Sequence, residues 1–283
     1  MRYKIAFLLS ILCALWSQTA WPAANGLTAD QIVAKHVAAR GGLDAWRAVQ
    51  ALSLNGKIDA GRGDSVQRSA QFTQGGKSSK SARVAAATNG SKAQPNAQVQ
   101  LPIMLALARP NKSRVEIQFA GKTAVQVYDG ANGWKLRPYL NRNDVEPFTA
   151  EEAKSEAERV GPEGALVDYA AKGTKVELEG TEPVEGHNAY KMKLTMKNGD
   201  VQHVWIDAQS FLDVKVEGIP RRMDGKMHTV WVYQRDFRTV QGVKIPFVLE
   251  TVVDGYPDMH KMVFEKAEVN PKFADDFFAK PRA

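Results

Sequence analysis

Residues 190–207, with the sequence YKMKLTMKNGDVQHVWID, decide the fold of this chain. Two runs of alternating apolar and polar residues flank Asn198-Gly199, and such a dipeptide between alternating runs is the strongest short-range signal for a β-hairpin. If the loop consists of those two residues, counting outward pairs Met196 with Val201 and Met192 with Trp205. The stretch therefore predicts an antiparallel hairpin with this register.

The two faces of this predicted hairpin differ in character. Because side chains alternate between the faces of a strand, Lys191, Lys193 and Asp200 would share a polar face. An antiparallel sheet with one polar face normally packs its other face against a core. That other face is predicted to be mainly apolar and to carry Met192, Leu194, Met196, Val201, His203 and Trp205.

The chain begins like an exported protein. Arg2 and Lys4 precede an apolar run over residues 5–16 that is too short to span a bilayer, and small residues follow it. We therefore interpret residues 1–24 as a signal peptide and expect a periplasmic protein, with an uncleaved anchor as the alternative. Cys13, the only cysteine, lies in this segment, so the mature chain is expected to depend on neither a disulfide nor a thiol.

The charge balance is mildly basic. The formal net charge is +7, and loss of Arg2 and Lys4 with the signal peptide lowers it to +5. Such a balance is typical of a soluble protein, and attraction to anionic lipid or to an acidic partner is the alternative. Residues 75–97 are rich in Gly, Ser, Lys, Ala and Asn without any periodicity, which predicts a flexible insert rather than a tract that binds nucleic acid or lipid.

Local signals predict two helical regions and a long series of strands. Thr28 with Gln31, and Thr149 with Glu152, form capping boxes that begin helices. Successive strands with short turns pair as neighbours, so the fold class is α+β with one large, twisted antiparallel sheet that tends to curl. The predicted strands are 52–58, 66–72, 99–107, 113–119, 124–128, 134–137, 175–179, 189–196, 201–206, 211–217, 226–236, 245–253 and 260–269.

The sequence carries no motif for catalysis or metal binding. It has no G-x-S-x-G, no P-loop and no H-E-x-x-H, and its five histidines are scattered singly. We therefore predict no enzyme, no catalytic residue, no metal and no cofactor, although carboxylates from distant strands could still form a glycosidase-like pair. His203 is either a core histidine with a backbone or hydroxyl hydrogen-bond partner or a polar group inside a ligand cavity.

Methionine is concentrated in the C-terminal half of the chain. Its flexible, polarizable side chain suits a surface that accepts apolar ligands of variable shape, while the filling of an ordinary core is the alternative interpretation. Six of the eight methionines lie there: Met192, Met196, Met223, Met227, Met259 and Met262.

Several stretches, taken in order, resemble the periplasmic lipoprotein-carrier superfamily that includes the LolA, LolB and RseB proteins. The likeness is to the group of outer membrane lipoprotein-sorting proteins and covers most of the mature chain. It is carried by ADQIVAKHVAARGGLDAW (29–46), ALARPNKSRVEI (106–117), VYDGANGW (127–134), HVWIDAQSFLDVKVEG (203–218), RDFRTVQGVKIPFVLE (235–250) and VNPKFADDFF (269–278).

This resemblance implies a single domain over residues 25–283, a half-barrel closed by helices that act as a lid. Its apolar cavity would hold acyl chains of a lipoprotein or lipid in transit between the inner and outer membranes. A monomer is expected, with an inner-membrane transporter or outer-membrane receptor as its protein partner and without nucleic acid. The alternative is an RseB-like sensor or interaction module without a transport role. The predicted cavity wall is Met192, Leu194, Met196, Val201, His203, Trp205, Val214, Met262 and Phe264.

Overall fold

The computed structural model describes residues 26–59, 99–138, 142–159 and 161–282. The predicted signal peptide at 1–24, the strand at 66–72 and the insert at 75–97 lie outside these residues. The described helices are α1 (Ala29–Ala39), α2 (Leu43–Ala48) and α4 (Ala150–Ala157). Both predicted capping boxes are present, because the Thr28 and Thr149 hydroxyls accept hydrogen bonds from the backbone N–H groups of Gln31 and Glu152.

The strands run through the chain in two long series separated by α4. The first series is β1 (Ala51–Asp59), β2 (Gln100–Ala108), β3 (Lys112–Phe119), β4 (Lys122–Tyr128), β5 (Gly133–Arg137) and β6 (Arg142–Pro147). The second series is β7 (Lys175–Val184), β8 (His187–Thr195), β9 (Val201–Asp207), β10 (Asp213–Met223), β11 (Lys226–Val240), β12 (Val243–Val253) and β13 (Tyr256–Val269).

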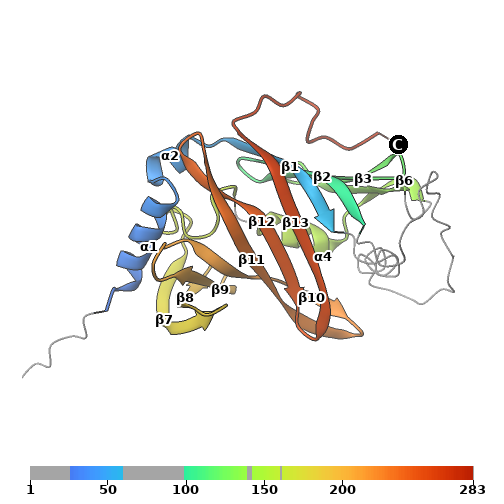
Figure 1. Cartoon of the computed structure of the whole chain (residues 1–283). Helices are drawn as coiled ribbons and strands as arrows, with labels where there is room; N and C mark the ends of the chain where they lie inside the picture. The colour runs from blue at the N-terminus through green and yellow to red at the C-terminus, as the bar shows by residue number, and fades with distance from the viewer. Residues whose placement is uncertain (1–25, 60–98, 139–141, 160, 283) are drawn as a thin grey trace, which may run out of the picture.

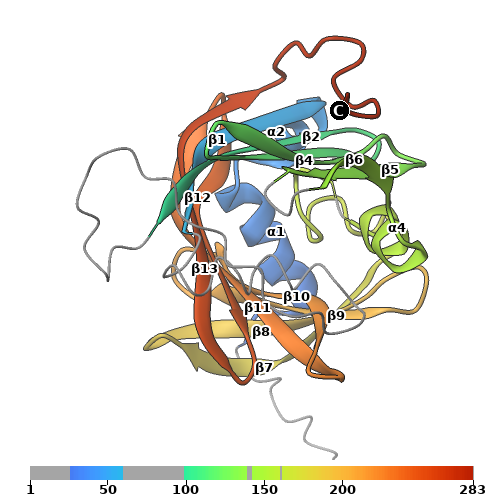
Figure 2. The same ribbon diagram turned by 90° about the vertical axis from the view of Figure 1, so that its right-hand side faces the viewer.

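These strands form one antiparallel sheet of thirteen strands in the order β6-β5-β4-β3-β2-β1-β13-β12-β11-β10-β9-β8-β7. The two series are joined where β1 pairs with β13, while β6 and β7 are its edges. The sheet curls around α1 as an unclosed half-barrel (Figures 1 and 2). The predicted α+β class with a large curled antiparallel sheet is therefore confirmed. We call the face that contacts the helices the concave face.

Tight turns fix the register of much of the sheet. In four hairpins a two-residue loop has positive φ at both positions, the geometry of a type I′ turn that matches the twist of the flanking strands. These loops are Ala120-Gly121, Glu185-Gly186, Asp224-Gly225 and Gln241-Gly242.

The β8–β9 hairpin corrects the predicted register by one residue. Thr195 pairs with Val201 and Met196 bonds to Asp200, so the three residues 197–199, rather than two, form the loop. The Met196 N–H donates to the Asp200 carbonyl at 2.8 Å, and only Gly199 in the loop has a positive φ, of 90°. The Asn-Gly signal correctly located the hairpin, but the longer loop changed its pairing.

A one-residue shift turns one strand over relative to its partner. Met192 pairs with Val204 rather than with Trp205, and Lys191 pairs with Trp205. The predicted shared face was therefore wrong. Met192 and Val204 lie on the concave face, whereas Trp205 lies on the opposite, outer face with His203.

The C-terminal segment covers part of the outer face (Figure 1). Phe278 is buried against β2 and β4 beside Ala106 and Val127, and its ring meets Phe277 edge to face. Arg114 on β3 donates a hydrogen bond to the Phe277 carbonyl at 2.7 Å and lies over the Phe277 ring. These contacts cover apolar side chains that the strand alternation leaves outside the half-barrel.

Gly56 tests how closely β1 approaches β13. The pairing shifts at this residue, and a Cβ here would lie 2.1 Å from the Val263 carbonyl oxygen and 2.6 Å from the Phe264 Cα. We expect Gly56→Ala to lower the free energy of unfolding by about 2 kcal/mol, because backbone atoms must shift. Urea denaturation measures this change. Gly26→Ala, where no heavy atom lies within 4 Å, is the control, and equal stability of the two variants would contradict the expectation.

Candidate functional site

A band of apolar side chains crosses the concave face from β12 to β3. Leu249 pairs with Met262, which in turn pairs with Ile58 on β1. Leu105 on β2 pairs with Val115 on β3. These residues pack on a buried layer that includes Leu54, Ile103 and Phe264, yet they remain partly exposed themselves. We define the concave band as Ile58, Leu105, Val115, Ile117, Leu249 and Met262.

One end of the concave face is filled by α1. Ile32 and Val33 on this helix pack against Met192, Leu194 and other side chains of β8 and β9. The Ile32, Met192 and Leu194 side chains are each 0% exposed. No space for a ligand therefore separates α1 from this part of the sheet.

Arg40 at the end of α1 ties the helices to distant strands. Its side chain is 5% exposed and donates to Asp213 on β10 at 3.0 Å and to the Lys244 carbonyl on β12 at 2.8 Å. The Arg40 carbonyl accepts a hydrogen bond from the Trp46 indole on α2 at 3.0 Å. A cation this deeply buried requires such partners, so these bonds hold α1 and α2 in one position.

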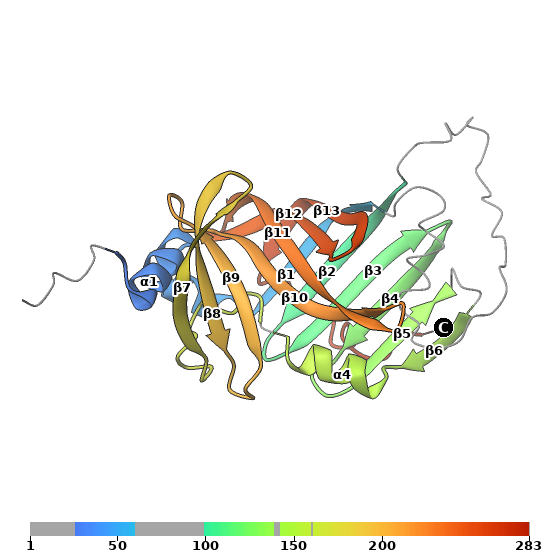
Figure 3. The ribbon, with the colours of Figure 1, turned by 90° about the horizontal axis from the view of Figure 1, so that it is seen from below.

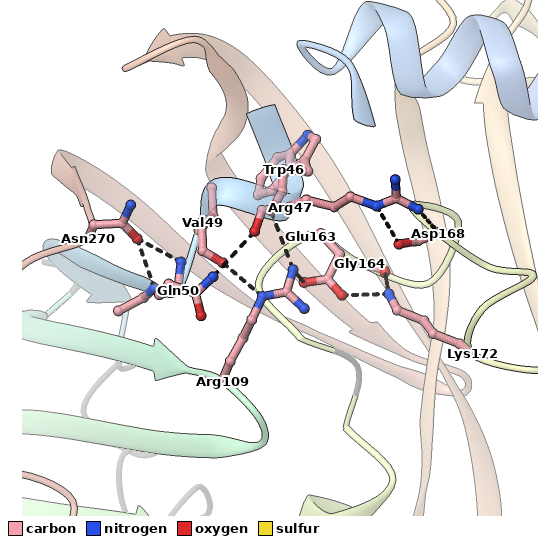
Figure 4. Close-up of polar contacts among 11 residues, drawn as sticks. Trp46, Arg47, Val49, Gln50, Arg109, Glu163, Gly164, Asp168, Lys172 and Asn270 are labelled. Atoms are coloured by element: carbon pink, nitrogen blue, oxygen red, sulfur yellow. Dashed lines mark hydrogen bonds and ion pairs between the residues drawn. The ribbon is translucent and has the colours of Figure 1, made fainter. Parts of the chain in front are cut away.

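The segment after α4 crosses to α2 and is held there by a buried carboxylate (Figure 4). Glu163 is 2% exposed and lies 2.9 Å from the Arg109 guanidinium and 2.6 Å from the Lys172 ammonium. Arg109 also donates to the carbonyl oxygens of Val49, at 2.8 Å, and Trp46, at 3.3 Å. We call Glu163, Arg109 and Lys172 the Glu163 cluster. Through Arg109 it joins this segment to α2 and to the connection between α2 and β1.

Two further sets of polar contacts lie near the Glu163 cluster (Figure 4). Arg47 on α2 binds Asp168 with two hydrogen bonds of 2.9 and 3.0 Å. The Asn270 side chain accepts from the backbone N–H of Gln50 at 2.7 Å and donates to the Ala48 carbonyl at 3.0 Å. The end of β13 is thereby fastened to the α2–β1 connection.

In contrast to α1, helix α4 is held mainly by polar contacts. Glu156 accepts a hydrogen bond from the Ser113 hydroxyl at 2.9 Å, and the Lys135 ammonium lies 2.5 Å from Glu152. Glu156 is the one buried residue of this helix. Helices α1 and α4 lie towards opposite ends of the molecule (Figure 3), so they cover different parts of the half-barrel.

The structure divides the predicted cavity-wall residues among several environments. Met192, Leu194 and Met196 pack in the cluster beneath α1, with Met196 partly buried. Met262 belongs to the concave band and Phe264 to the buried layer beneath it. The remaining four do not lie with these: Val201 is 49% exposed at the start of β9, and His203, Trp205 and Val214 pack elsewhere.

Trp205 and its neighbours form a cation–aromatic group on the outer face. The Lys215 ammonium lies 4.1 Å from the Trp205 ring centre and 5.0 Å from that of Trp231. Burial against these rings lowers the pKa of Lys215. The Trp205 indole donates to Glu182, which satisfies its buried N–H. Trp205 therefore belongs to an outer cluster with Val214 rather than to the concave face.

His203 is held between carboxylates from two strands. Its Nδ1 lies 2.6 Å from Glu217 on β10, and its Nε2 lies 3.5 Å from Glu179 on β7. Lys191 also pairs with Glu179, at 2.9 Å. The partners of His203 are therefore carboxylates in a polar cross-strand network, not the predicted backbone or hydroxyl group. The same network borders an open pocket of about 510 Å³ lined by Glu179, Gly180, Thr181, Glu182 and Lys191, whose charged groups do not suit an acyl chain.

Most of the concave band was absent from the predicted wall. Leu101-Pro102-Ile103-Met104-Leu105 alternates in the way that would have placed Leu105 on the face of Ile103. Alternation within strands could not predict that β1 pairs with β13. This pairing brings Ile58 beside Met262, although about two hundred residues of chain separate them. The alternation of apolar residues was visible within each strand, but the pairing of strands distant in sequence was not.

The part of the chain that the structure describes has neither a metal-binding cluster nor a membrane-spanning helix. No group of three or more His, Cys, Asp or Glu side chains there is arranged to hold a metal ion. No helix there is long and apolar enough to cross a membrane. The concave band itself offers hydrocarbon side chains and a thioether, whose chemistry is suited to apolar contact.

Comparison with known proteins supports the fold. No family model matches the sequence, and no curated protein matches it. A LolA superfamily protein from Nitrosomonas europaea has a similar structure, with a TM-score of 0.51 and 13% identity over 90% of this chain and 99% of the other. A DUF1329 family protein from Desulfovibrio piger gives a TM-score of 0.53 and 11% identity over 89% and 98% of the two chains.

A third structure, of an outer membrane lipoprotein-sorting protein domain from Vibrio parahaemolyticus, gives a TM-score of 0.51 and 10% identity over 88% of this chain and 95% of the other. At such identities the likeness establishes the fold. The chain therefore has the fold that its sequence resemblance predicted, over most of its length.

The Glu163 cluster provides a test of how the segment after α4 is held. We expect Glu163→Gln to lower the free energy of unfolding by about 3 kcal/mol, because Arg109 and Lys172 lose a shared, buried carboxylate. Asp168→Asn is the matched control at the more exposed Arg47 pair, where the cost is expected to stay below about 1 kcal/mol. Urea denaturation of both variants decides the matter, and equal losses would show that Glu163 is not the anchor.

His36 on α1 predicts a pH dependence. It is 1% exposed, its Nδ1–H donates to the Phe211 carbonyl at 3.0 Å, and burial lowers its pKa from the ordinary value of 6.5 despite the nearby Asp213. The unfolded chain therefore binds a proton more readily at this residue. Its contribution to stability is present above about pH 6.5 and is lost as the pH falls below that value.

The measurement is the free energy of unfolding of wild type and His36→Asn between about pH 7.5 and 5. The wild type is expected to lose more stability on acidification than the variant, which has no imidazole to protonate there. His187→Asn, at an exposed histidine, should keep the wild-type slope. Parallel profiles for wild type and His36→Asn would contradict the assignment.

Proposed function

We propose that this protein binds acyl chains of lipid or lipoprotein on its concave face and carries them between the inner and outer membranes. The observation that carries the proposal is the concave band, six apolar side chains that remain partly exposed inside a curled sheet. Apolar side chains that share one face and keep part of their surface exposed are typical of ligand grooves and interaction sites. The fold shared with a lipoprotein-sorting protein domain is consistent with it.

Hydrocarbon contact alone can supply enough binding energy. Burying a methylene is worth about 0.8 kcal/mol, so about ten methylenes supply about 8 kcal/mol before the cost of association. Ile58, Leu105, Leu249 and Met262 contribute flat or flexible apolar surface and no charge. Such a wall discriminates little between acyl chains of different length, as a carrier of lipid requires.

The proposed lid is α4 rather than α1. Helix α1 is joined to the sheet by side chains that are fully buried, whereas α4 is joined by Ser113–Glu156 and Lys135–Glu152 contacts. Polar contacts can be exchanged for water at small net cost, while separating a packed apolar interface exposes it. Movement of α4 would therefore open the half-barrel without disturbing the core beneath α1.

The predicted signal peptide supports a periplasmic location for this activity, where lipid in transit must be shielded from water. Neither a catalytic residue nor a cofactor is part of the proposal. An RseB-like sensor would use the same scaffold without transport. Exchange between vesicles distinguishes the two, because a carrier transfers bound lipid to acceptor vesicles, whereas a sensor retains its ligand or binds a protein instead.

The proposal is tested by native mass spectrometry of the purified chain, with extraction and analysis of retained lipid. We expect a lipid adduct, or uptake of a fluorescent fatty acid by chain from which lipid has been removed. A chain that neither retains nor takes up lipid would overturn the proposal.

A matched pair of variants locates the binding face. Leu249 faces the concave side, whereas its neighbour Val248 faces outward on the same strand. We expect Leu249→Trp to weaken uptake of the fluorescent fatty acid at least about tenfold by occupying the groove, about 1.4 kcal/mol. Val248→Trp should leave uptake unchanged. Equal effects of the two substitutions would place binding elsewhere.

A further inference from the structure

The tip of the β10–β11 hairpin exposes apolar side chains next to cations. Ile219 is 58% exposed and Met227 is 51% exposed, and these are the two most exposed large apolar residues in the described part of the chain. Residues 219–228 also carry Arg221, Arg222 and Lys226, against one carboxylate, that of Asp224. We call residues 219–228 the basic tip.

The pairing of the two strands places unlike side chains together. Arg222 lies directly opposite Met227, so a guanidinium and an exposed thioether side chain share one face. Arg221 lies opposite His228, and Lys226 opposite Met223. Among the described residues, no carboxylate forms an ion pair with any of the three cations.

The basic tip rests on a small core of its own. Met223 packs with Val230 and Val253 and is 7% exposed. Tyr256 donates a hydrogen bond to Asp224, which engages the one carboxylate of the tip and links it to the β12–β13 hairpin. The His228 imidazole donates to the Asp254 carbonyl at 3.0 Å. The tip is thus presented by two connected hairpins, whose contacts hold its backbone in place.

The basic tip lies at the free end of the half-barrel. The other ends of the same strands meet the helices, since the Lys244 N–H donates to the Arg40 carbonyl and Asn270 binds Ala48. The paired ends of β10–β11 and β12–β13 project away from α1 and α2 (Figure 1). A flat surface could therefore meet the tip before it meets the helical end.

We propose that the basic tip docks this protein on the surface of an anionic lipid bilayer, with Ile219 and Met227 entering the interface and Arg221, Arg222 and Lys226 contacting headgroup phosphates. Exposed apolar side chains beside unpaired cations match both layers of such a surface, the hydrocarbon boundary and the negative headgroups. A soluble acidic protein would satisfy the cations but would gain less from two apolar side chains at a projecting tip.

This docking surface is separate from the concave band, so membrane docking and acyl-chain binding can be disproved independently. Each cation near an anionic membrane contributes about fivefold to the partition coefficient. Replacing all three, as Arg221→Gln, Arg222→Gln and Lys226→Gln, should weaken binding about a hundredfold. Because these side chains make no buried ion pair in the described structure, the triple variant is expected to fold normally and to take up fatty acid as wild type does.

The test is co-sedimentation of the full mature chain with vesicles of equal parts phosphatidylglycerol and phosphatidylcholine, compared with pure phosphatidylcholine. Wild type is expected to bind the anionic vesicles, less strongly as the salt rises above about 0.1 M. A matched control removes three exposed lysines elsewhere, as Lys122→Gln, Lys272→Gln and Lys280→Gln, with the same change in net charge. It should lose far less binding than the basic-tip variant.

A second variant tests the apolar part. Ile219→Ser with Met227→Ser keeps every charge and should also weaken vesicle binding. Leu249→Trp, which blocks the concave band, should still bind vesicles. Absence of wild-type binding to anionic vesicles, or equal losses in the basic-tip and control variants, would overturn the docking proposal. Binding of a soluble acidic peptide with the same affinity as vesicles would do so as well.

Discussion

The buried Arg40 side chain is the contact on which the placement of the helices depends. Its guanidinium binds Asp213 on β10 and the Lys244 carbonyl on β12, two strands that are separated in the sheet by β11. If either acceptor were removed, the buried Arg40 charge would lose a partner that water cannot replace. The protein would then lose several kcal/mol of stability. Helix α1 can therefore end only where both acceptors converge. Through the indole of Trp46, the same residue also positions α2.

This placement divides the concave face into two unlike parts. Where α1 lies on β8 and β9, side chains such as Met192 are completely buried. Further around the curl, between β12 and β3, side chains such as Met262 remain partly exposed. The Glu163 cluster fastens the segment after α4 to α2, because Arg109 binds both Glu163 and the Trp46 carbonyl. One sheet thus carries a fully buried core and a partly exposed apolar band side by side.

Local sequence signals predicted most elements of this fold but not all of their pairings. The capping boxes at Thr28 and Thr149 begin helices as expected. The Asn198-Gly199 dipeptide located a hairpin, yet its register depended on loop length, which alternation does not encode. Asp224-Gly225 is an equally strong hairpin signal, but the strand prediction did not use it. It closes the β10–β11 hairpin, which carries the basic tip. β6 was also missed, because RNDVEP lacks a clear alternation.

The candidate site illustrates a limit of alternation as a guide to function. Met192 and Met262 both lie in strands whose apolar residues recur every second position, and both face the helices' side of the sheet. Only the position of α1, set by contacts between Arg40 and residues more than 170 positions away, separates the buried methionine from the partly exposed one. Periodicity identifies which side chains share a face, whereas exposure depends on what tertiary contacts bring to that face. Met262 rather than Met192 therefore belongs to the partly exposed apolar part of the concave face.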